Sequence, residues 1–117
     1  MISATQSALS ALQAYGTKIE ANSNNVANSG TQGYKRTHVT LTEGVQGGVA
    51  TNIRKTDAPG PILYDRSATG REPIEQSNVD LGREFPEMIM NTHSFKANLK
   101  TLQTADELFS SILDLKA

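Results

Sequence analysis

The sequence predicts a mainly α-helical protein with a small β part, in which long helices at the two ends of the chain pack as an antiparallel coiled coil. Apolar residues recur at steps of three, four or seven in both terminal segments, whereas threonine, glycine and proline dominate the middle. The 117 residues are enough for one domain. We therefore expect residues 1–34 and 77–117 to form one helical unit, joined by a short β-hairpin or extended segment at 35–76.

The N-terminal segment has the pattern of one narrow helical stripe. Alanines along it favour the helix and allow another helix to approach closely. Gly16 interrupts the pattern without a proline, so we expect a local weakness and no break. The helix should end within residues 28–33, where two glycines and several polar side chains compete for backbone hydrogen bonds. The apolar positions of the stripe are Ile2, Leu9, Leu12, Ile19 and Val26.

The middle segment predicts short strands or extended arms. Gly47-Gly48 is suited to a hairpin turn between them. Pro59 and Pro61 each remove a backbone donor and interrupt regular structure. Residues 65–76 are polar and mixed in charge, which predicts a solvated loop.

The last third carries the strongest periodic signal and predicts a coiled-coil seam. Asp80 is suited to cap the start of this helix, with Glu84 in its first turns, and Pro86 either kinks the helix or marks its true beginning. A polar residue at a seam position, such as Asp106, costs stability and can fix the register. The seam positions are Leu81, Phe85, Met88, Thr92, Phe95, Leu99, Leu102, Asp106, Phe109 and Leu113.

Composition argues against several classes of protein. The net charge of -1 provides no cationic surface for nucleic acid. The chain has no cysteine, and His38 and His93 have no partners at suitable spacing, so we expect no catalytic, cofactor or metal site. No apolar run reaches the roughly 20 residues that span a bilayer, and the start lacks the features of a cleaved signal peptide.

Two stripes at opposite ends can pair within one chain and still leave half of each stripe uncovered, which favours assembly with other subunits. A private two-helix core is the alternative, and periodicity alone permits both. The asparagines at 22, 24, 25 and 28 are equally open: they indicate either a fraying helix end or amide hydrogen bonds across a subunit boundary.

Two long motifs resemble the signatures of a known family. Residues 7–15 read SALSALQAY and lead into NNVANSGTQGYK at 24–35, which resembles the N-terminal signature of the bacterial flagellar rod and hook axial proteins. SNVDL at 77–81 and FKANLK at 95–100 look like the C-terminal signature of the same family. The short middle segment is closest to the small proximal-rod type, although residues 91–93 depart from the glutamine-rich stretch usual there.

The resemblance implies a structural subunit, and no enzyme, in the flagellar basal-body rod within the periplasmic space. It implies export without a cleaved signal peptide through the flagellar type III apparatus, and assembly with other rod and hook axial proteins or copies of itself. A small coiled-coil adaptor or chaperone that binds axial proteins is the alternative. We expect the subunit interface to include Leu9, Leu12, Ile19, Asn25, Val26, Asn28, Tyr34, Asn78, Val79, Leu81, Phe95, Asn98, Leu99, Leu102, Asp106 and Phe109.

Overall fold

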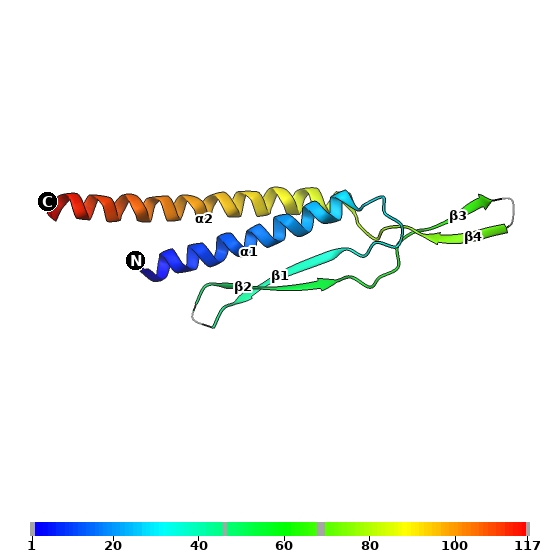
Figure 1. The fold of residues 1–117 in the computed structure, drawn as a ribbon, viewed down its shortest axis with the longest axis horizontal. Coiled ribbons are helices and arrows are strands. Elements are labelled where there is room, and N and C mark those ends of the chain that lie inside the picture. Colours follow the sequence, from blue (N-terminus) through cyan, green and yellow to red (C-terminus); the bar gives the residue numbers. More distant parts are fainter. Residues whose placement is uncertain (1, 46, 68–69, 117) are drawn as a thin grey trace.

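The computed structural model describes residues 2–45, 47–67 and 70–116, and it contains two long helices with two β-hairpins between them (Figure 1). The helices α1 and α2 run antiparallel along one another, so that both chain ends lie at the same end of the molecule. This arrangement confirms the predicted fold class. The elements are α1 (Ile2–Ala27), β1 (Thr37–Glu43), β2 (Val49–Lys55), β3 (Ile62–Ser67), β4 (Gly70–Glu75) and α2 (Leu81–Lys116).

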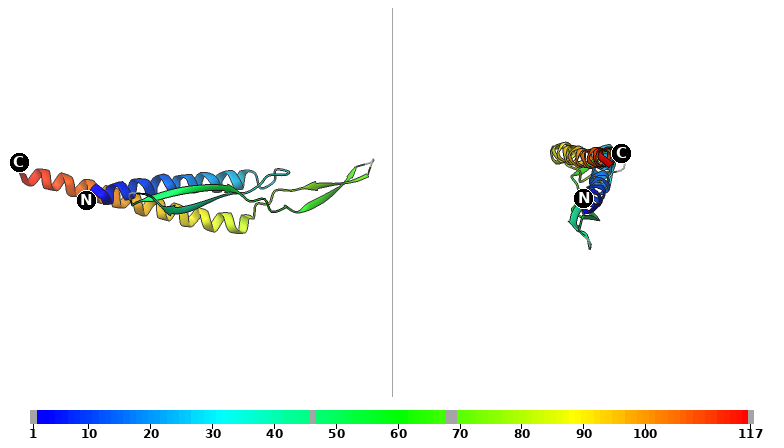
Figure 2. Two further views of the ribbon diagram at one scale, coloured as in Figure 1. Left: turned by 90° about the horizontal axis from the view of Figure 1, so that it is seen from below. Right: turned by 90° about the vertical axis from the view of Figure 1, so that its left-hand side faces the viewer.

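The molecule is strongly elongated. Its principal extents are 82 × 24 × 17 Å and its radius of gyration is 20.9 Å, whereas a compact chain of this length would have about 13 Å. The end of α2, residues 110–116, extends past the start of α1, and the β3–β4 hairpin extends in the opposite direction (Figures 1 and 2). Within the described residues, neither helix has an apolar stretch long enough to cross a membrane.

Helix α1 packs through small side chains. It runs without interruption through Gly16, as predicted, and ends at Ala27. Asn28 then turns back on the helix, because both its backbone N–H and its side-chain amide donate to the carbonyl of Asn24, at 3.1 and 2.9 Å. The predicted end of the helix is therefore confirmed. The buried apolar residues of α1 are Ala8, Ala11, Ala14 and Ala21.

Helix α2 begins at Leu81, directly after its predicted cap. The Asp80 side chain accepts a hydrogen bond from the Gly82 backbone N–H at 2.9 Å, and its carbonyl accepts from two further backbone N–H groups. These bonds satisfy donors that a helix start leaves free. Pro86 lies inside the helix, so it does not mark the beginning.

The first hairpin lies against α1. β1 pairs antiparallel with β2 across the predicted turn, where Gly47 and Gly48 have positive φ angles of 76° and 92°. The Ser10 hydroxyl of α1 accepts a hydrogen bond from the Val49 N–H at 3.1 Å. A Cβ atom on Gly48 would lie 2.6 Å from that hydroxyl oxygen, so this close approach of hairpin and helix requires glycine.

A second hairpin, β3–β4, occupies the region where a solvated loop was predicted for residues 65–76, and that prediction is wrong. β3 and β4 pair antiparallel along their whole length. Pro73 is tolerated because a two-stranded hairpin has open edges, where a missing backbone donor costs little. The side chains Ile62, Leu63 and Tyr64 are all exposed, so the hairpin lacks the alternating burial that usually reveals a strand.

The seam of α2 differs from the predicted one at every other position. Glu84 and Asn91 are buried, in place of the predicted Phe85 and Thr92, and Phe85 is 50% exposed. The cause is that Glu84 finds a cationic partner and amide donors at the surface of α1 and β1, which makes its burial favourable. The covered positions repeat at steps of four and three: Glu84, Met88, Asn91, Phe95, Asn98, Leu102 and Ala105.

Candidate functional site

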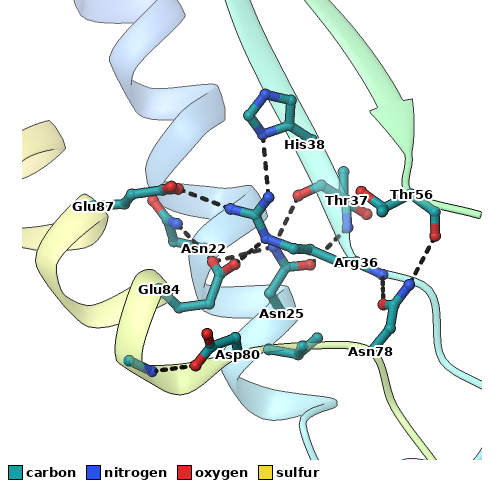
Figure 3. A network of polar contacts seen from close by, with 12 residues as sticks. Asn22, Asn25, Arg36, Thr37, His38, Thr56, Asn78, Asp80, Glu84 and Glu87 are labelled. Atoms are coloured by element: carbon teal, nitrogen blue, oxygen red, sulfur yellow. Dashed lines mark hydrogen bonds and ion pairs between the residues drawn. The ribbon is translucent and has the colours of Figure 1, made fainter. Parts of the chain in front are cut away.

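The buried polar groups of the protein gather where α1, β1 and the first turns of α2 meet (Figure 3). Two of them, Glu84 and Asn25, are the largest fully buried side chains among the described residues, with 0% and 1% of their surface exposed. The rest of the core consists of alanines and Val39. We call this cluster the polar junction and define it as Asn22, Asn25, Arg36, Glu84 and Asn91.

The centre of the polar junction is an ion pair between Arg36, which lies directly before β1, and Glu84 of α2. The guanidinium Nε donates to Glu84 Oε1. The second carboxylate oxygen accepts from the side-chain amides of Asn22 and Asn25, at 2.7 and 3.2 Å. Both oxygens of a completely buried carboxylate therefore have partners, which is the condition for burying a charge without a large penalty.

Arg36 also holds a second point on α2. Its Nη2 donates to Glu87 Oε2 at 2.9 Å, one turn along the helix from Glu84, and its Nη1 lies 3.3 Å from His38 Nδ1. The backbone N–H of the same residue donates to the side-chain carbonyl of Asn78 at 2.6 Å. One arginine thus connects the start of the hairpin to both α2 and the segment that precedes it (Figure 3).

Asn25 fixes the reversal of the chain after α1. Its side-chain oxygen accepts from the Thr37 backbone N–H at 2.8 Å and from the Tyr34 hydroxyl at 3.1 Å. Its amide nitrogen donates to the Thr37 carbonyl at 2.8 Å. The side chain therefore pairs with β1 as a neighbouring strand would, and ties that strand to the end of α1.

A second contact joins the two helices two turns further along α2. The side-chain amide of Asn91 on α2 donates to the side-chain oxygen of Asn22 on α1 at 2.7 Å. Because Asn22 also donates to the carboxylate of Glu84, three side chains form a continuous chain of hydrogen bonds between the helices.

The burial of Glu84 and its hydrogen bonds act on its pKa in opposite directions. Burial raises the pKa, whereas the hydrogen bonds from Arg36, Asn22 and Asn25 and the positive charge of Arg36 lower it. The pKa of Glu84 lies below its usual value as a result. The carboxylate is therefore charged at neutral pH, as the ion pair requires.

Outside the polar junction, Glu75 joins the segments around the second hairpin. The Lys35 ammonium donates to its carboxylate at 2.5 Å and the Gly60 N–H donates to the same oxygen at 2.9 Å. These bonds lower the pKa of Glu75, the one from Lys35 most. The Gly33 N–H donates to the Glu75 carbonyl at 3.0 Å. The segment that follows α1 therefore lies beside the end of β4, which leads into α2.

The side chains of the polar junction connect secondary-structure elements to one another. Every buried side-chain nitrogen and oxygen of the described residues has a hydrogen-bond partner. Among the residues that the structure describes, no three His, Cys, Asp or Glu side chains are grouped as a metal site would require. Paired, buried polar groups of this kind fix the relative position of the segments that carry them.

The predicted interface residues fall into three sets in the single chain. Asn25, Tyr34 and Asn78 use their side chains within the chain, and Asn28 and Asn98 bond to the backbone of their own helices. The exposed set is Leu9, Leu81, Leu99, Asp106 and Phe109. The half-buried set is Leu12, Ile19, Val26, Val79, Phe95 and Leu102. Their part in a subunit interface stays a prediction.

Sequence reasoning missed Arg36, Asn91 and the buried role of Glu84. A signal for them exists, since Glu84 and Asn91 are seven residues apart and Asn22 and Asn25 three apart. Each pair therefore lies on one face of its helix. Where two helices each carry a pair of polar residues on the face turned toward the other helix, these residues are candidates for a buried network.

Large apolar side chains that α1 leaves uncovered follow α2 along its length. Their exposed fractions run from 39% to 88%. Two grooves of about 370 and 360 Å³ flank the start of α1, with Phe109 in the wall of one and Leu108 in the wall of the other. The uncovered residues are Leu81, Phe85, Ile89, Met90, Leu99, Leu108, Phe109, Ile112, Leu113 and Leu115.

Fold and site together define an elongated protein in which the two terminal helices pack against each other. Buried charged and amide side chains join them, and α2 carries exposed apolar side chains. Residues 6–35 match the family described as Flagella basal body rod protein. Residues 73–115 match the one described as Flagellar basal body rod FlgEFG protein C-terminal. These segments make up more than half of the chain and contain nearly all of both helices. The chain belongs to the flagellar rod and hook family of axial structural proteins.

Individual relatives match over short stretches. The flagellar hook protein FlgE of Treponema pallidum is 44% identical over 43 residues, which are 37% of this chain and 9% of that protein. FlgE of Helicobacter pylori (strain ATCC 700392 / 26695) is 34% identical over 68 residues, covering 53% of this chain and 10% of the relative. The flagellar basal-body rod protein FlgG of Bacillus subtilis is 44% identical over 43 residues, which are 37% of this chain and 16% of FlgG. The matched part of this chain thus spans about a sixth or less of each relative.

Proposed function

We propose that the protein is a structural subunit of the bacterial flagellar basal-body rod and that it enters the axial tube through its terminal helices. The observation that carries the proposal is the number of exposed apolar side chains on α2. In a monomer these side chains would remain in contact with water. The same family signatures that identify the two helices support an axial position for them.

The energy available from this surface supports assembly. Burying one fully exposed leucine or phenylalanine contributes roughly 1.5–3 kcal/mol. The ten side chains of α2 are 39–88% exposed, so covering each would contribute a corresponding part of that amount. Extensive exposed apolar surface on a folded chain usually marks a site of interaction with another protein.

The partners that we propose are other rod and hook axial proteins or further copies of the chain, in the periplasmic part of the flagellum. Residues 1–34 and 77–117 would supply the helical unit for these contacts, and residues 35–76 the outer part. We propose that the subunit reaches the rod through the flagellar type III export apparatus without a cleaved signal peptide, and that it catalyses no reaction.

The test is whether the protein is built into basal bodies. We expect deletion to abolish flagella and purified basal bodies to contain the wild-type chain. Leu99→Asp should leave export intact and block incorporation, because it replaces one of the exposed apolar side chains of α2 with a charge. His93→Asp is the matched control, since it introduces the same charge at an exposed polar residue of the same helix. Wild-type incorporation of Leu99→Asp would contradict the proposal.

The same exposed surface would also suit a small adaptor or chaperone that binds axial proteins outside the tube. The two functions differ in where the protein is found. Soluble, monodisperse dimers at high concentration, together with its absence from purified basal bodies, would favour the adaptor.

A further inference from the structure

We propose that the polar junction sets the register in which α1 and α2 pair. Its buried charges reject a pairing shifted by one heptad, and this choice fixes how far α2 extends past α1. The register is a property of the single chain, and only its consequence for assembly rests on the proposed function.

The apolar contacts between the helices do not define the register well. Along the seam, Met88, Phe95, Leu102 and Phe109 recur every seven residues. A shift of α2 by seven residues in either direction replaces Met88, Phe95 and Leu102 with another large apolar side chain; only at Phe109, in one of the two directions, would a polar residue, Lys116, arrive. The fully buried apolar residues of α1 are alanines, which present no large side chain to resist such a shift.

The other line of seam positions is chemically uneven. Glu84, Asn91, Asn98 and Ala105 are also spaced by seven, but they change from charged to amide to methyl. A shift by one heptad would place Asn91 where Glu84 lies. Arg36, which is itself buried, would then lose the carboxylate that neutralises it, and a buried unpaired charge is strongly unfavourable.

A shift in the opposite direction is no better. It would bring Ser77, which precedes α2, to the place of Glu84. The helix would have to extend through its own cap at Asp80 and lose the hydrogen bonds made there.

The arginine cannot follow α2, because the hairpin that carries it is held by α1. At one end Thr37 is bonded to the Asn25 side chain, and at the other Val49 is bonded to Ser10. Arg36 is therefore fixed relative to α1 (Figure 3). α2 is then the element that would have to shift. Glu84 and Glu87 bind it to this fixed arginine, and Asn78, just before the helix, accepts from the Arg36 backbone N–H. Of these contacts, only that of Glu84 is a completely buried charge.

A shift of seven residues would move α2 by about 10 Å. Movement toward the hairpin end would bring Ile112 level with Ala4, which now lines a groove with Ala105. Most of the end of α2 that now extends past α1 would then lie beside α1. The polar junction thus controls, from the far end of the helix, the surface that we propose neighbouring subunits cover.

Disulfide trapping in the purified full-length chain tests the register directly, because the sequence has no native cysteine. Ala4→Cys with Ala105→Cys reports the observed register. Ala4→Cys with Ile112→Cys, and Ala4→Cys with Asn98→Cys, report the two shifted ones. In the otherwise unchanged chain we expect the first pair to form at least about ten times more crosslink than either shifted pair, given the cost of breaking a buried ion pair.

The deciding variant removes both charges together. Arg36→Met with Glu84→Leu keeps comparable volume and leaves no unpaired charge in the buried core, because Glu87, which loses Arg36, is partly exposed to water. We therefore expect helical content by circular dichroism to be retained. The shifted pairs should then form within about threefold of the observed pair. Glu84→Gln alone should destabilise the fold more than the double variant, since it leaves Arg36 without its buried counter-charge. The control is Glu87→Gln, which removes a partly exposed partner of the same arginine and should keep the wild-type preference.

Three results would overturn the proposal. The first is a double variant that keeps the tenfold preference. The second is a double variant that loses its helices, which would assign the charges to stability in place of register. The third is an unchanged chain that traps all three pairs equally. The proposed function fails by a different result, a correctly paired chain that is missing from basal bodies, so the two failures are distinguishable.

Discussion

Glu84 shows what a completely buried carboxylate needs in order to stay charged. It has an arginine on one oxygen and two asparagine amides on the other, and no exposed surface. Removing one partner from such a group leaves the rest without a counter-charge, which costs more than the intact pair contributes.

We expect Glu84→Gln to lower the free energy of unfolding by about 3 kcal/mol at neutral pH, because Arg36 loses its completely buried carboxylate and keeps only the partly exposed Glu87. The effect should depend on pH. The folded-state pKa of Glu84 is lowered, so its stabilisation is complete above its unfolded value near 4.5 and is lost as the pH falls through the lower folded value. Urea unfolding of wild type and variant should therefore give a difference that shrinks on acidification.

Glu87→Gln provides the comparison for this measurement. Its carboxylate pairs with the same guanidinium but remains partly exposed, so we expect a loss of about 1 kcal/mol or less. A difference between wild type and Glu84→Gln that stays constant down to about pH 2 would show that the buried charge is not its source.

Glycine 48 and glycine 16 should respond oppositely to alanine. Gly48→Ala places a methyl group 2.6 Å from the Ser10 hydroxyl at a φ of 92°, so we expect a loss of about 1–3 kcal/mol and weaker packing of the hairpin on α1. Gly16→Ala meets no atom within 4 Å and lies inside a helix, so it should add roughly 0.5–1 kcal/mol. Thermal unfolding measures both, and equal signs would contradict this account.

At the scale of the element, periodicity and turn chemistry were enough to predict both helices and the first hairpin. Alanine spacing, the glycines at 47 and 48 and the cap at Asp80 are local signals, and each element forms where its signal lies. The second hairpin escaped prediction because its side chains are exposed and show no alternation. The polar junction escaped because Arg36 and Glu84 lie 48 residues apart, and no local pattern links them.

The cap of α2 can be tested by itself. Asp80→Ala removes the acceptor for the Gly82 N–H, so we expect the free energy of unfolding to fall by about 1 kcal/mol. Asp80→Asn keeps a capping oxygen and should stay close to wild type. If the two variants lose equal stability in urea unfolding, the charge of Asp80 matters and its hydrogen bond does not.

At the scale of the whole molecule, the elongated shape follows from what the core contains. Among the residues whose burial is described, the buried apolar ones are four alanines and one valine, which give little bulk around which the chain could become spherical. The charged and amide groups of the polar junction therefore hold together parts that a larger protein would join through aliphatic packing. Among the same residues, the large apolar side chains of both helices are half-buried or exposed.

Small-angle X-ray scattering of the dilute chain should give a radius of gyration near the 20.9 Å of the structure. A value close to the roughly 13 Å of a compact chain would mean that the two helices fold back on themselves in solution. A large rise with protein concentration would instead report association through α2.

The second hairpin stands apart from this arrangement. Among the described elements, β3 and β4 contact each other and no other strand or helix. The chain enters and leaves this hairpin through the paired backbone of Pro61 and Gln76, where the Gln76 N–H donates to the Pro61 carbonyl at 2.8 Å. Any length of polypeptide, even a folded guest domain, could therefore be spliced into the hairpin tip while the stem, and everything behind it, stays as it is. The outer hairpin could therefore be exchanged for another segment without changing the helices.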